Sequence, residues 1–289
     1  MCLILSLFAF FSYSEINIDN DELSISEIEE VGFIEVSQYK SKTTKISIKE
    51  HVLSIGKSAF AQWQNLHSVN FGVDLTMIGD YAFYGCTNLK TINYADEPSL
   101  YVIGSFAFSE CNGIEKFNLT NSLIESGDRA FFKCMNLKAF NNEYECPTFD
   151  VDDYGILYKG KINIADRSLI CCPPKFENPY PEYAIDVTCC KIENYAFAYC
   201  EYDNEIHFQD TSQGGPKLNV IDEGAFYEAK KLIINLEDCS KIEKIGEKAF
   251  YNCLGITELH FESCDDLISI ESETFYKCVN LNTIKLPQD

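Results

Sequence analysis

The strongest constraint on the fold is a short motif, centred on one phenylalanine, that recurs through most of the chain. Its eight copies are centred on Phe60, Phe83, Phe108, Phe131, Phe197, Phe226, Phe250 and Phe275. Successive copies are 23, 25 and 23 residues apart, then 66, then 29, 24 and 25. Leucine-rich repeats have a period of about 20 to 29 residues, which propeller blades and helical repeats do not match. Because one copy cannot bury its own apolar face, the motif predicts a solenoid of stacked repeats.

The second copy, IGDYAFYGCTNLKTINY at residues 78–94, contains every position of the motif. Apolar and polar residues alternate at its end, which predicts a short strand with one buried face. We expect Phe83 to fill the interior and the small Ala82 to allow close packing of the backbone. A glycine occupies one position in four copies, where we expect the chain to turn with a positive φ. These glycines are Gly56, Gly79, Gly104 and Gly246.

This motif resembles the BspA-like class of leucine-rich repeats, which occurs in surface antigens of bacteria and mucosal protists. The resemblance covers residues 46–286. A second stretch, DYGILY at residues 153–158, followed by Leu169, Ile170 and the pair Pro173 and Pro174, is similar to the irregular DGxLY unit that interrupts such arrays. The resemblance implies a secreted or surface protein that contacts host macromolecules or other cells.

The sequence therefore predicts a leucine-rich-repeat solenoid with repeats of about 23–25 residues. We expect a parallel β-sheet on its concave face and short turns or helical turns on the convex side. The predicted segments are an acidic N-terminal cap at 15–45, four repeats at 46–143, an irregular DGxLY-type unit at 144–191 and four repeats at 192–289. In the copy around Phe226, the apolar residues Leu232, Ile234 and Leu236 are one position out of register, which predicts a bulge or a shortened turn.

The N-terminus begins with the apolar run LILSLFAFF, followed by small residues and then by acidic ones. This pattern is typical of a signal peptide, here residues 1–14, although no basic residue precedes the run. A buried N-terminal strand or helix is the alternative. No other segment has the roughly 20 apolar residues of a spanning helix, so we expect no further transmembrane segment. The signal predicts a secreted or cell-surface protein, and a retained apolar run predicts a cytoplasmic one.

The 14 cysteines divide into two groups by their position in the repeat. Six follow the repeat phenylalanine by three residues, at a position that Trp63 and Ala229 also occupy, so we expect buried thiols in the core. Cys239 and Cys264 each precede their phenylalanine by eleven residues, and adjacent rungs would bring them within range of a disulfide. The pairs Cys171–Cys172 and Cys189–Cys190 bracket the irregular unit, so a cross-link of this unit is one interpretation. A four-cysteine zinc site is the alternative, but the spacing lacks the two-residue separation of a zinc knuckle or ribbon.

Catalysis has no support in the sequence. None of the four histidines lies in an HExxH pattern, and neither a phosphate-binding loop nor a GxSxG elbow is present. The chain has 45 acidic and 23 basic residues, so chance carboxylate pairs are common and indicate no catalytic dyad. We therefore expect no enzymatic activity, no cofactor and no metal. The net charge of −22 also argues against nucleic acid as a partner.

The tenth position after the phenylalanine carries asparagine in the first four copies, so these side chains are expected to stack in a column on the concave sheet. They form either a hydrogen-bonded ladder or part of a recognition strip. The predicted binding face comprises Ser68, Asn70, Thr91, Asn93, Lys116, Asn118, Asn141, Glu205, His207, Glu258, His260, Thr283 and Lys285. Asn118 also lies in a glycosylation sequon, although strand positions are often left unmodified.

These observations favour a non-enzymatic adhesion or binding protein, with a protein or glycan as its ligand. An intracellular scaffold protein is the alternative. The last rung has no evident cap before Pro287, and an open solenoid end exposes strand edges and apolar surface. Self-association through that rung is therefore a further prediction.

Overall fold

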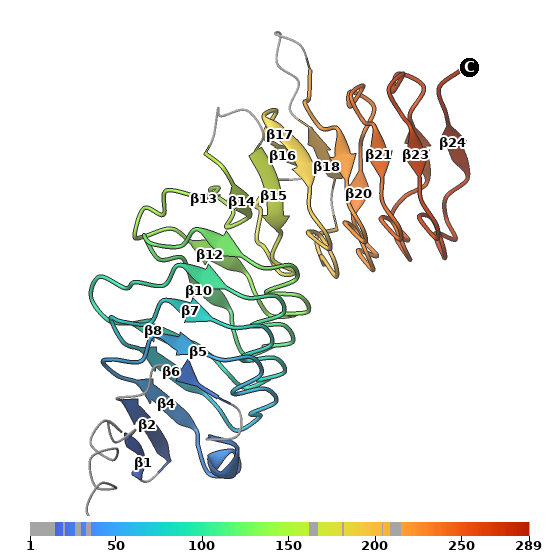
Figure 1. The fold of residues 1–289 in the computed structure, drawn as a ribbon. Helices are drawn as coiled ribbons and strands as arrows, with labels where there is room; N and C mark the ends of the chain where they lie inside the picture. Colours follow the sequence, from blue (N-terminus) through green and yellow to red (C-terminus); the bar gives the residue numbers. More distant parts are fainter. Residues whose placement is uncertain are drawn as a thin grey trace, which may run out of the picture. The chain divides into compact units, whose positions relative to one another are not determined.

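The structure is a computed structural model that describes residues 15–19, 21–26, 30–32, 36–161, 167–180, 182–203, 205–208 and 215–288. The predicted signal peptide, residues 1–14, lies outside the described residues. The chain divides into two compact units. Unit 1 runs to Ile114 and includes Thr120–Ala130, and unit 2 comprises Glu115–Leu119 and Phe131–Asp289. In each unit the strands are stacked as successive rungs (Figure 1).

Unit 1 contains two β-sheets. The first, which we call the long-strand sheet, has the order β1-β2-β4-β6-β8. Its strands are β1 (Glu15–Asp19), β2 (Glu22–Ser26), β4 (Lys45–Ile48), β6 (Ser68–Phe71) and β8 (Thr91–Tyr94). All neighbours are parallel except β1 and β2, which form an antiparallel hairpin. The second residue of β6 is buried and the third is half-buried, as the alternating sequence predicts.

The opposite side of unit 1 is a second parallel sheet made of two-residue strands. Its members are β3 (Glu30–Val31), β5 (Ser54–Ile55), β7 (Met77–Ile78), β9 (Val102–Ile103) and β11 (Glu125–Ser126). The predicted solenoid of parallel strands is confirmed, and this short-strand sheet adds a second ordered side. Helix is scarce: within the described ranges the one assigned helix is the 3-10 turn η1 (Ser37–Tyr39).

In unit 2 the long strands fall into three groups, β10-β12, β16-β18-β20 and β22-β24. Their bounds are β10 (Lys116–Asn118), β12 (Ala139–Asn141), β16 (Glu182–Ile185), β18 (Glu205–Phe208), β20 (Ile233–Ile234), β22 (Glu258–His260) and β24 (Thr283–Lys285). All these neighbours are parallel. After Phe226, where the sequence predicts a bulge or a shortened turn, β20 has only two residues and pairs with β18 without a register shift.

The other sheet of unit 2 has seven strands and begins with the irregular unit. Its members are β13 (Phe149–Val151), β14 (Leu157–Lys159), β15 (Arg167–Cys171), β17 (Cys189–Ile192), β19 (Val220–Ile221), β21 (Lys244–Ile245) and β23 (Ser269–Ile270). The strands β13, β14 and β15 are antiparallel, and the sheet becomes parallel from β15 onward. The DYGILY stretch thus contains the turn into β14.

The repeat phenylalanines stack face to face in the interior. In unit 2 the ring centroid of Phe226 lies 5.0 Å from that of Phe197 and 5.1 Å from that of Phe250. In unit 1 the ring of Phe83 is 5.3 Å from that of Phe108. Phe131 differs, because it packs edge-on against its neighbours in unit 2. Burial of these rings and their regular stacking make the repeat phenylalanine the main apolar contact between rungs.

The motif glycines have a different role from the one that the sequence suggested. Neither Gly79 nor Gly246 has a positive φ. A Cβ on Gly79 would lie 2.9 Å from the carbonyl oxygen of Ile55, and one on Gly246 would lie 2.6 Å from Asp222 C. These positions need glycine because the neighbouring rung approaches closely, so the predicted positive φ is wrong.

Positive φ values occur instead two residues before and two residues after each repeat phenylalanine. Around Phe60 they are Ser58 (57°) and Gln62 (60°), and all eight copies follow this pattern, mostly with residues other than glycine. The N–H groups of Ser58, Phe60 and Gln62 all donate to carbonyl oxygens of the next rung, at 2.9, 2.8 and 2.5 Å. The hydrogen bonds between rungs offset the cost of the left-handed conformation.

Candidate binding surface

All thirteen residues of the predicted binding face lie on or beside the long strands, but the structure divides them into groups. In unit 1, Asn70 pairs with Asn93 across β6 and β8, and Ser68 pairs with Thr91. Asn93 Nδ2 donates to Asn70 Oδ1 at 2.8 Å, and Asn70 Nδ2 donates to Ser47 Oγ at 3.1 Å. The amides form a hydrogen-bonded ladder, which agrees with the structural interpretation of this column.

Unit 2 has a similar pair of asparagines on two neighbouring strands. Asn118 and Asn141 are paired on β10 and β12, and Asn141 Nδ2 donates to Asn118 Oδ1 at 2.8 Å. Lys116 lies opposite Ala139 in the same pair. The hydroxyl-bearing Thr120 of the sequon is buried. Asn118 is half-buried and one of its side-chain atoms is in a hydrogen bond, so the surroundings disfavour a glycan.

Charged side chains replace the asparagines on the later long strands. On β18, His207 Nδ1 lies 3.6 Å from a carboxylate oxygen of Glu182, and Glu205 Oε1 accepts a hydrogen bond from Asn235 at 3.0 Å. On β22, His260 lies within 3.4 Å of both Glu258 and Glu262.

Thr283 and Lys285 of β24 lie opposite Glu258 and His260, respectively. The face is thus amide-rich in one part and ionic in another.

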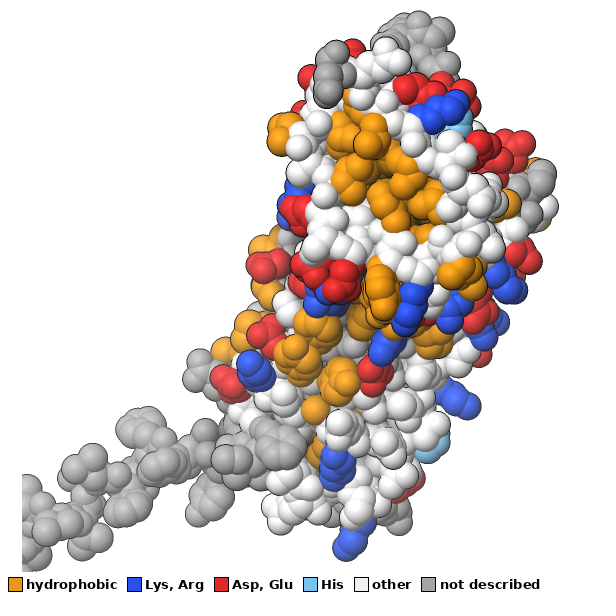
Figure 2. Space-filling model, turned by 90° about the vertical axis from the view of Figure 1, so that its right-hand side faces the viewer, with side chains coloured by type: hydrophobic (Ala, Val, Ile, Leu, Met, Phe, Trp, Pro, Cys, Tyr) orange, Lys and Arg blue, Asp and Glu red, His pale blue; other side chains and the backbone are white. Residues whose placement is uncertain are grey.

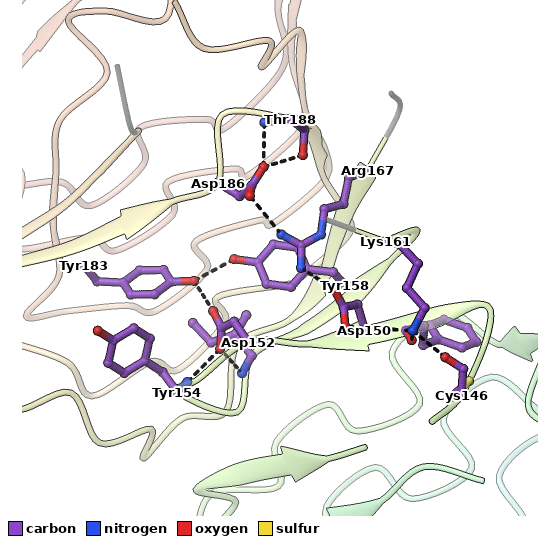
Figure 3. A network of polar contacts seen from close by, with 12 residues as sticks. Cys146, Asp150, Asp152, Tyr154, Tyr158, Lys161, Arg167, Tyr183, Asp186 and Thr188 are labelled. Atoms are coloured by element: carbon purple, nitrogen blue, oxygen red, sulfur yellow. Dashed lines mark hydrogen bonds and ion pairs between the residues drawn. The ribbon is translucent and has the colours of Figure 1, made fainter. Parts of the chain in front are cut away.

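The irregular unit contains a buried polar network that the sequence did not reveal (Figure 3). The Arg167 guanidinium carbon lies 3.7 Å from the ring centroid of Tyr158, and the Arg167 side chain is only 2% exposed. Arg167 Nη2 lies 3.2 Å from Asp150, and Nη1 lies 3.6 Å from Asp186. The arginine therefore joins β13, β15 and the segment after β16 through two carboxylates.

The second half of this network is a chain of hydroxyl groups. The hydroxyls of Tyr158 and Tyr183 are 2.6 Å apart, and the Tyr183 hydroxyl donates to Asp152. Asp152 Oδ1 also accepts the backbone N–H groups of Tyr154 and Ile156, at 3.0 and 2.9 Å. The single hydroxyl hydrogen of Tyr183 is already used in its hydrogen bond to Asp152. The Tyr158 hydroxyl is therefore the donor in the hydrogen bond between the two tyrosines.

Burial dominates the electrostatics of these groups. Desolvation raises the pKa of Asp152 above its ordinary 3.8, although hydrogen bonds from Tyr183 and two backbone N–H groups act in the opposite direction. Desolvation also raises the pKa values of Tyr158 and Tyr183 well above 10.0. The tyrosines therefore stay neutral donors. Every member is held by another member, as expected of a network that fixes the turn after β13.

Two hollows flank the irregular unit on the surface of unit 2. One, of about 710 Å³, is lined by residues 174–179 and 201–203. The other, of about 460 Å³, lies between the turn at 152–155 and the strands β10 and β12, and includes Lys116 and Asn141. Gly155, with a φ of 80°, packs directly on Ala139. Of the predicted face, only Lys116 and Asn141 line this second hollow. The interruption of the repeat is the one feature of the sequence that marks this region.

The six cysteines on the repeat ladder are buried free thiols, as predicted: Cys86, Cys111, Cys134, Cys200, Cys253 and Cys278. Four of these thiols donate to the carbonyl oxygen of the repeat phenylalanine on the preceding rung, for example Cys253 Sγ to Phe226 O at 2.9 Å. This bond explains why cysteine suits a core position that alanine can also fill. Burial raises the pKa of Cys189 to about 12, which makes this thiol unreactive.

The predicted disulfide partners Cys239 and Cys264 are free thiols in the structure. They do lie on adjacent rungs, because Cys264 Sγ donates to the backbone oxygen of Cys239 at 3.2 Å. Desolvation raises the pKa of both thiols. Within the described ranges, no group of three or more His, Cys, Asp and Glu residues is arranged to hold a metal ion.

The rung that ends with β24 exposes a patch of large apolar side chains (Figure 2). Ile268 is 84% exposed and Val279 is 76% exposed, and Tyr276, Ile284 and Leu286 are also exposed.

No helix in the described part of the chain is long and apolar enough to cross a membrane.

Several solved structures have a similar fold. The Pneumococcal vaccine antigen PcpA is 23% identical with a TM-score of 0.61, over 75% of this chain and 56% of that antigen. The chain thus matches little more than half of the length of PcpA. A leucine-rich cell surface protein from Faecalibacterium prausnitzii is 20% identical with a TM-score of 0.58, over 96% of this chain and 93% of that protein.

A leucine-rich-repeat protein from Eubacterium ventriosum has a TM-score of 0.66 at 18% identity, over 93% of this chain and 81% of that protein. No curated protein matches the chain. The model of the BspA type leucine-rich repeat region matches six copies, at residues 34–152 and 181–289. These ranges cover most of the chain and leave out the turn and strands β14 and β15 of the irregular unit. The chain therefore belongs to the BspA-type leucine-rich-repeat family.

Proposed function

We propose that this chain is a non-enzymatic recognition protein, secreted or held at the cell surface, that binds a protein or glycan of a host or a neighbouring cell. The long-strand sheets are its contact surface. The cell-surface protein from Faecalibacterium prausnitzii and the antigen PcpA, whose names refer to surface or antigenic proteins, support this localisation.

The observation that carries the proposal is the regular exposure of polar side chains along the long strands. In β6 and β8 the outward positions are Ser68, Asn70, Thr91 and Asn93, and each has a counterpart directly opposite on the neighbouring strand. Side chains on adjacent strands are about 5 Å apart, so one ligand would contact several rungs at once. Solenoid proteins commonly bind through such extended surfaces.

The test is capture of partners from an extracellular-matrix extract by the purified protein. The variants Asn93→Arg and Asn118→Arg place a long cation on the contact surface, one in each unit. We expect both variants to lose captured partners that the parent protein retains. Lys57→Arg, on the segment after the short strand β5, is the control and should capture the same partners as the parent. Equal capture by all proteins would overturn the assignment of this surface.

A second candidate is an intracellular scaffold, and the thiols favour it. The described cysteines are all free, and free thiols are typical of reducing compartments. The two candidates are separated by locating the protein in intact cells with a membrane-impermeant label and by sequencing the N-terminus of the mature chain. A labelled chain that begins after residue 14 supports export, and an unlabelled chain that retains Met1 supports the scaffold.

The apolar patch on the rung of β24 supports the expectation that the protein self-associates. Two copies that cover each other's patch would remove Ile268 and Val279 from water. We expect the parent protein to sediment as a dimer at high concentration and the variant Val279→Lys to remain monomeric. A monomeric parent at high concentration would rule out this association.

A further inference from the structure

The long-strand sheet of unit 2 is interrupted between β20 and β22, which belong to consecutive rungs. β20 pairs with β18 on one side and β22 pairs with β24 on the other. Among the described residues, no backbone hydrogen bond links residues 231–236 to residues 255–261. The N–H and C=O groups along these two facing edges therefore lack the partners that other long strands have.

The connection into β20 is one residue shorter than those into the long strands on either side. The buried strand residue Ile234 follows its repeat phenylalanine by eight residues, whereas Ile206 and Leu259 follow theirs by nine. β20 nevertheless pairs in register with β18, with Ile206 opposite Ile234. The segments that precede the two strands are in contact, because a Cβ on Gly255 would lie 2.3 Å from the carbonyl oxygen of Leu232.

A cavity of about 230 Å³ occupies this gap, and consecutive residues of both strands line it. Its apolar wall includes Ile233, which is 46% exposed, together with Ile256 and Leu259, which are buried. Its polar lining includes the amide of Asn235. The site thus combines apolar surface with backbone acceptors that have no strand beside them.

Carboxylates surround the same cavity. Glu205, Glu237 and Glu258 all belong to its lining. In the described part of the chain, no lysine or arginine lies within ion-pair distance of these three carboxylates. Glu205 accepts a hydrogen bond from the neutral Asn235, and His260 Nε2 lies 3.4 Å from Glu258 Oε2. The lining of the cavity therefore has an excess of negative charge.

We propose that this cavity binds the side chain of an exposed arginine on a protein partner. A guanidinium has five donors in a fixed plane and no acceptor, which matches three carboxylates without a lysine or arginine partner and strand carbonyls at an unpaired edge. Its aliphatic stem would pack on Ile233 while the charged end meets the glutamates. The assignment rests on the proposed recognition function and specifies the chemistry of the ligand.

The test uses the full-length protein and the peptide acetyl-Gly-Arg-Gly-amide. We expect the peptide to shift the NMR signals of the Asn235 side-chain amide and of the Gly255 backbone amide in a saturable way. The matched peptide with citrulline in place of arginine has a similar shape without the charge, and it should not shift them. Equal shifts with both peptides, or no shift with the arginine peptide, would overturn the proposal.

A variant series checks the role of the carboxylates. The double variant Glu205→Gln with Glu258→Gln keeps the size and the acceptor oxygens but removes two charges. We expect it to bind the arginine peptide at least about tenfold more weakly, because charge-assisted hydrogen bonds are roughly twice as strong as neutral ones. Glu143→Gln, at an exposed position away from the cavity, should bind like the parent. Unchanged affinity in the double variant would also overturn the proposal.

These outcomes are separable from those of the capture experiment. If Asn93→Arg and Asn118→Arg abolish partner capture but the arginine peptide does not bind, the recognition function stands and the arginine site falls. If the peptide binds but partner capture does not depend on the long-strand sheets, the arginine site is supported and the assignment of the long-strand sheets as the contact surface is overturned.

Discussion

The repeated rungs and the irregular unit of unit 2 are held together by different interactions. In the rungs, Phe226 is fully buried and stacks between the rings of Phe197 and Phe250. In the irregular unit, the fully buried Tyr158 instead contacts the guanidinium of Arg167 and the hydroxyl of Tyr183. Apolar stacking repeats from rung to rung, whereas each contact of the polar network occurs once.

The difference has an energetic consequence. A rung tolerates exchange among apolar residues, since Cys, Trp and Ala share one ladder position at Cys86, Trp63 and Ala229. The network has no such freedom, because removal of one buried charge leaves its partners without compensation. Substitutions in the two regions should therefore differ in how strongly they depend on the chemistry of the replacement.

The largest expected effect comes from Phe226→Ala. Loss of a buried phenylalanine costs about 3 to 5 kcal/mol, and loss of two stacked contacts adds about 0.5 to 1.5 kcal/mol for each aromatic pair. Urea unfolding of the parent and the variant measures the difference. Phe226→Leu, which keeps most of the volume, should recover more than half of the loss. If leucine is as damaging as alanine, then ring stacking and not burial dominates the rung.

Arg167→Met should have the next largest effect, about 3 to 5 kcal/mol, because it leaves the carboxylates of Asp150 and Asp186 without their buried cation. Urea is again the suitable denaturant, since it does not screen charges. Lys191→Met is the matched control: Lys191 bridges Glu193 and Asp222 at 2.8 and 2.7 Å, but its side chain is 34% exposed. That variant should lose less than about 1 kcal/mol. Similar losses of unfolding free energy in the two variants would mean that the buried network does not depend on its charges more strongly than a partly exposed ion pair on a rung does.

The same contrast explains what the sequence could predict. The period of the phenylalanines was sufficient to predict the solenoid and the buried ladder cysteines. Arg167, Asp150 and Asp186 lie outside any repeat, so no recurring pattern in the sequence identifies them as partners.

The positive φ values around Phe60 could not be predicted from the sequence for another reason. Serine and glutamine carry no signal for positive φ, and the hydrogen bonds between rungs that impose this conformation exist only in the stack.

Asp152 offers a pH test of the polar network. Its pKa is raised in the folded protein, so the folded state holds this proton more tightly than the unfolded chain does. The contribution of Asp152 to stability is therefore greatest below its ordinary pKa of 3.8 and falls as the pH rises through the folded pKa. In Asp152→Asn, the amide oxygen can still accept the two backbone N–H groups, and this titration is absent.

The measurement is the difference in urea midpoint between Asp152→Asn and the parent, followed from below pH 3.8 to neutral pH. We expect the variant to gain stability relative to the parent as the pH rises. The comparison of the two proteins removes the titration of the other carboxylates. A difference that stays constant with pH would show that burial does not set the protonation of Asp152.

The smallest expected effect concerns the strain stored in a regular rung. Ser58 has a φ of 57°, a conformation that costs residues other than glycine about 1 to 2 kcal/mol. In Ser58→Gly this cost disappears, but glycine loses more conformational freedom on folding, by about 0.5 to 1 kcal/mol. We therefore expect a net stabilisation between zero and about 1.5 kcal/mol in urea unfolding. Ser58→Ala keeps the Cβ and should give no gain, which isolates the backbone effect from the loss of the hydroxyl. Equal stability of the glycine and alanine variants would mean that the hydrogen bonds from Ser58 and Phe60 to the next rung hold the turn without measurable strain.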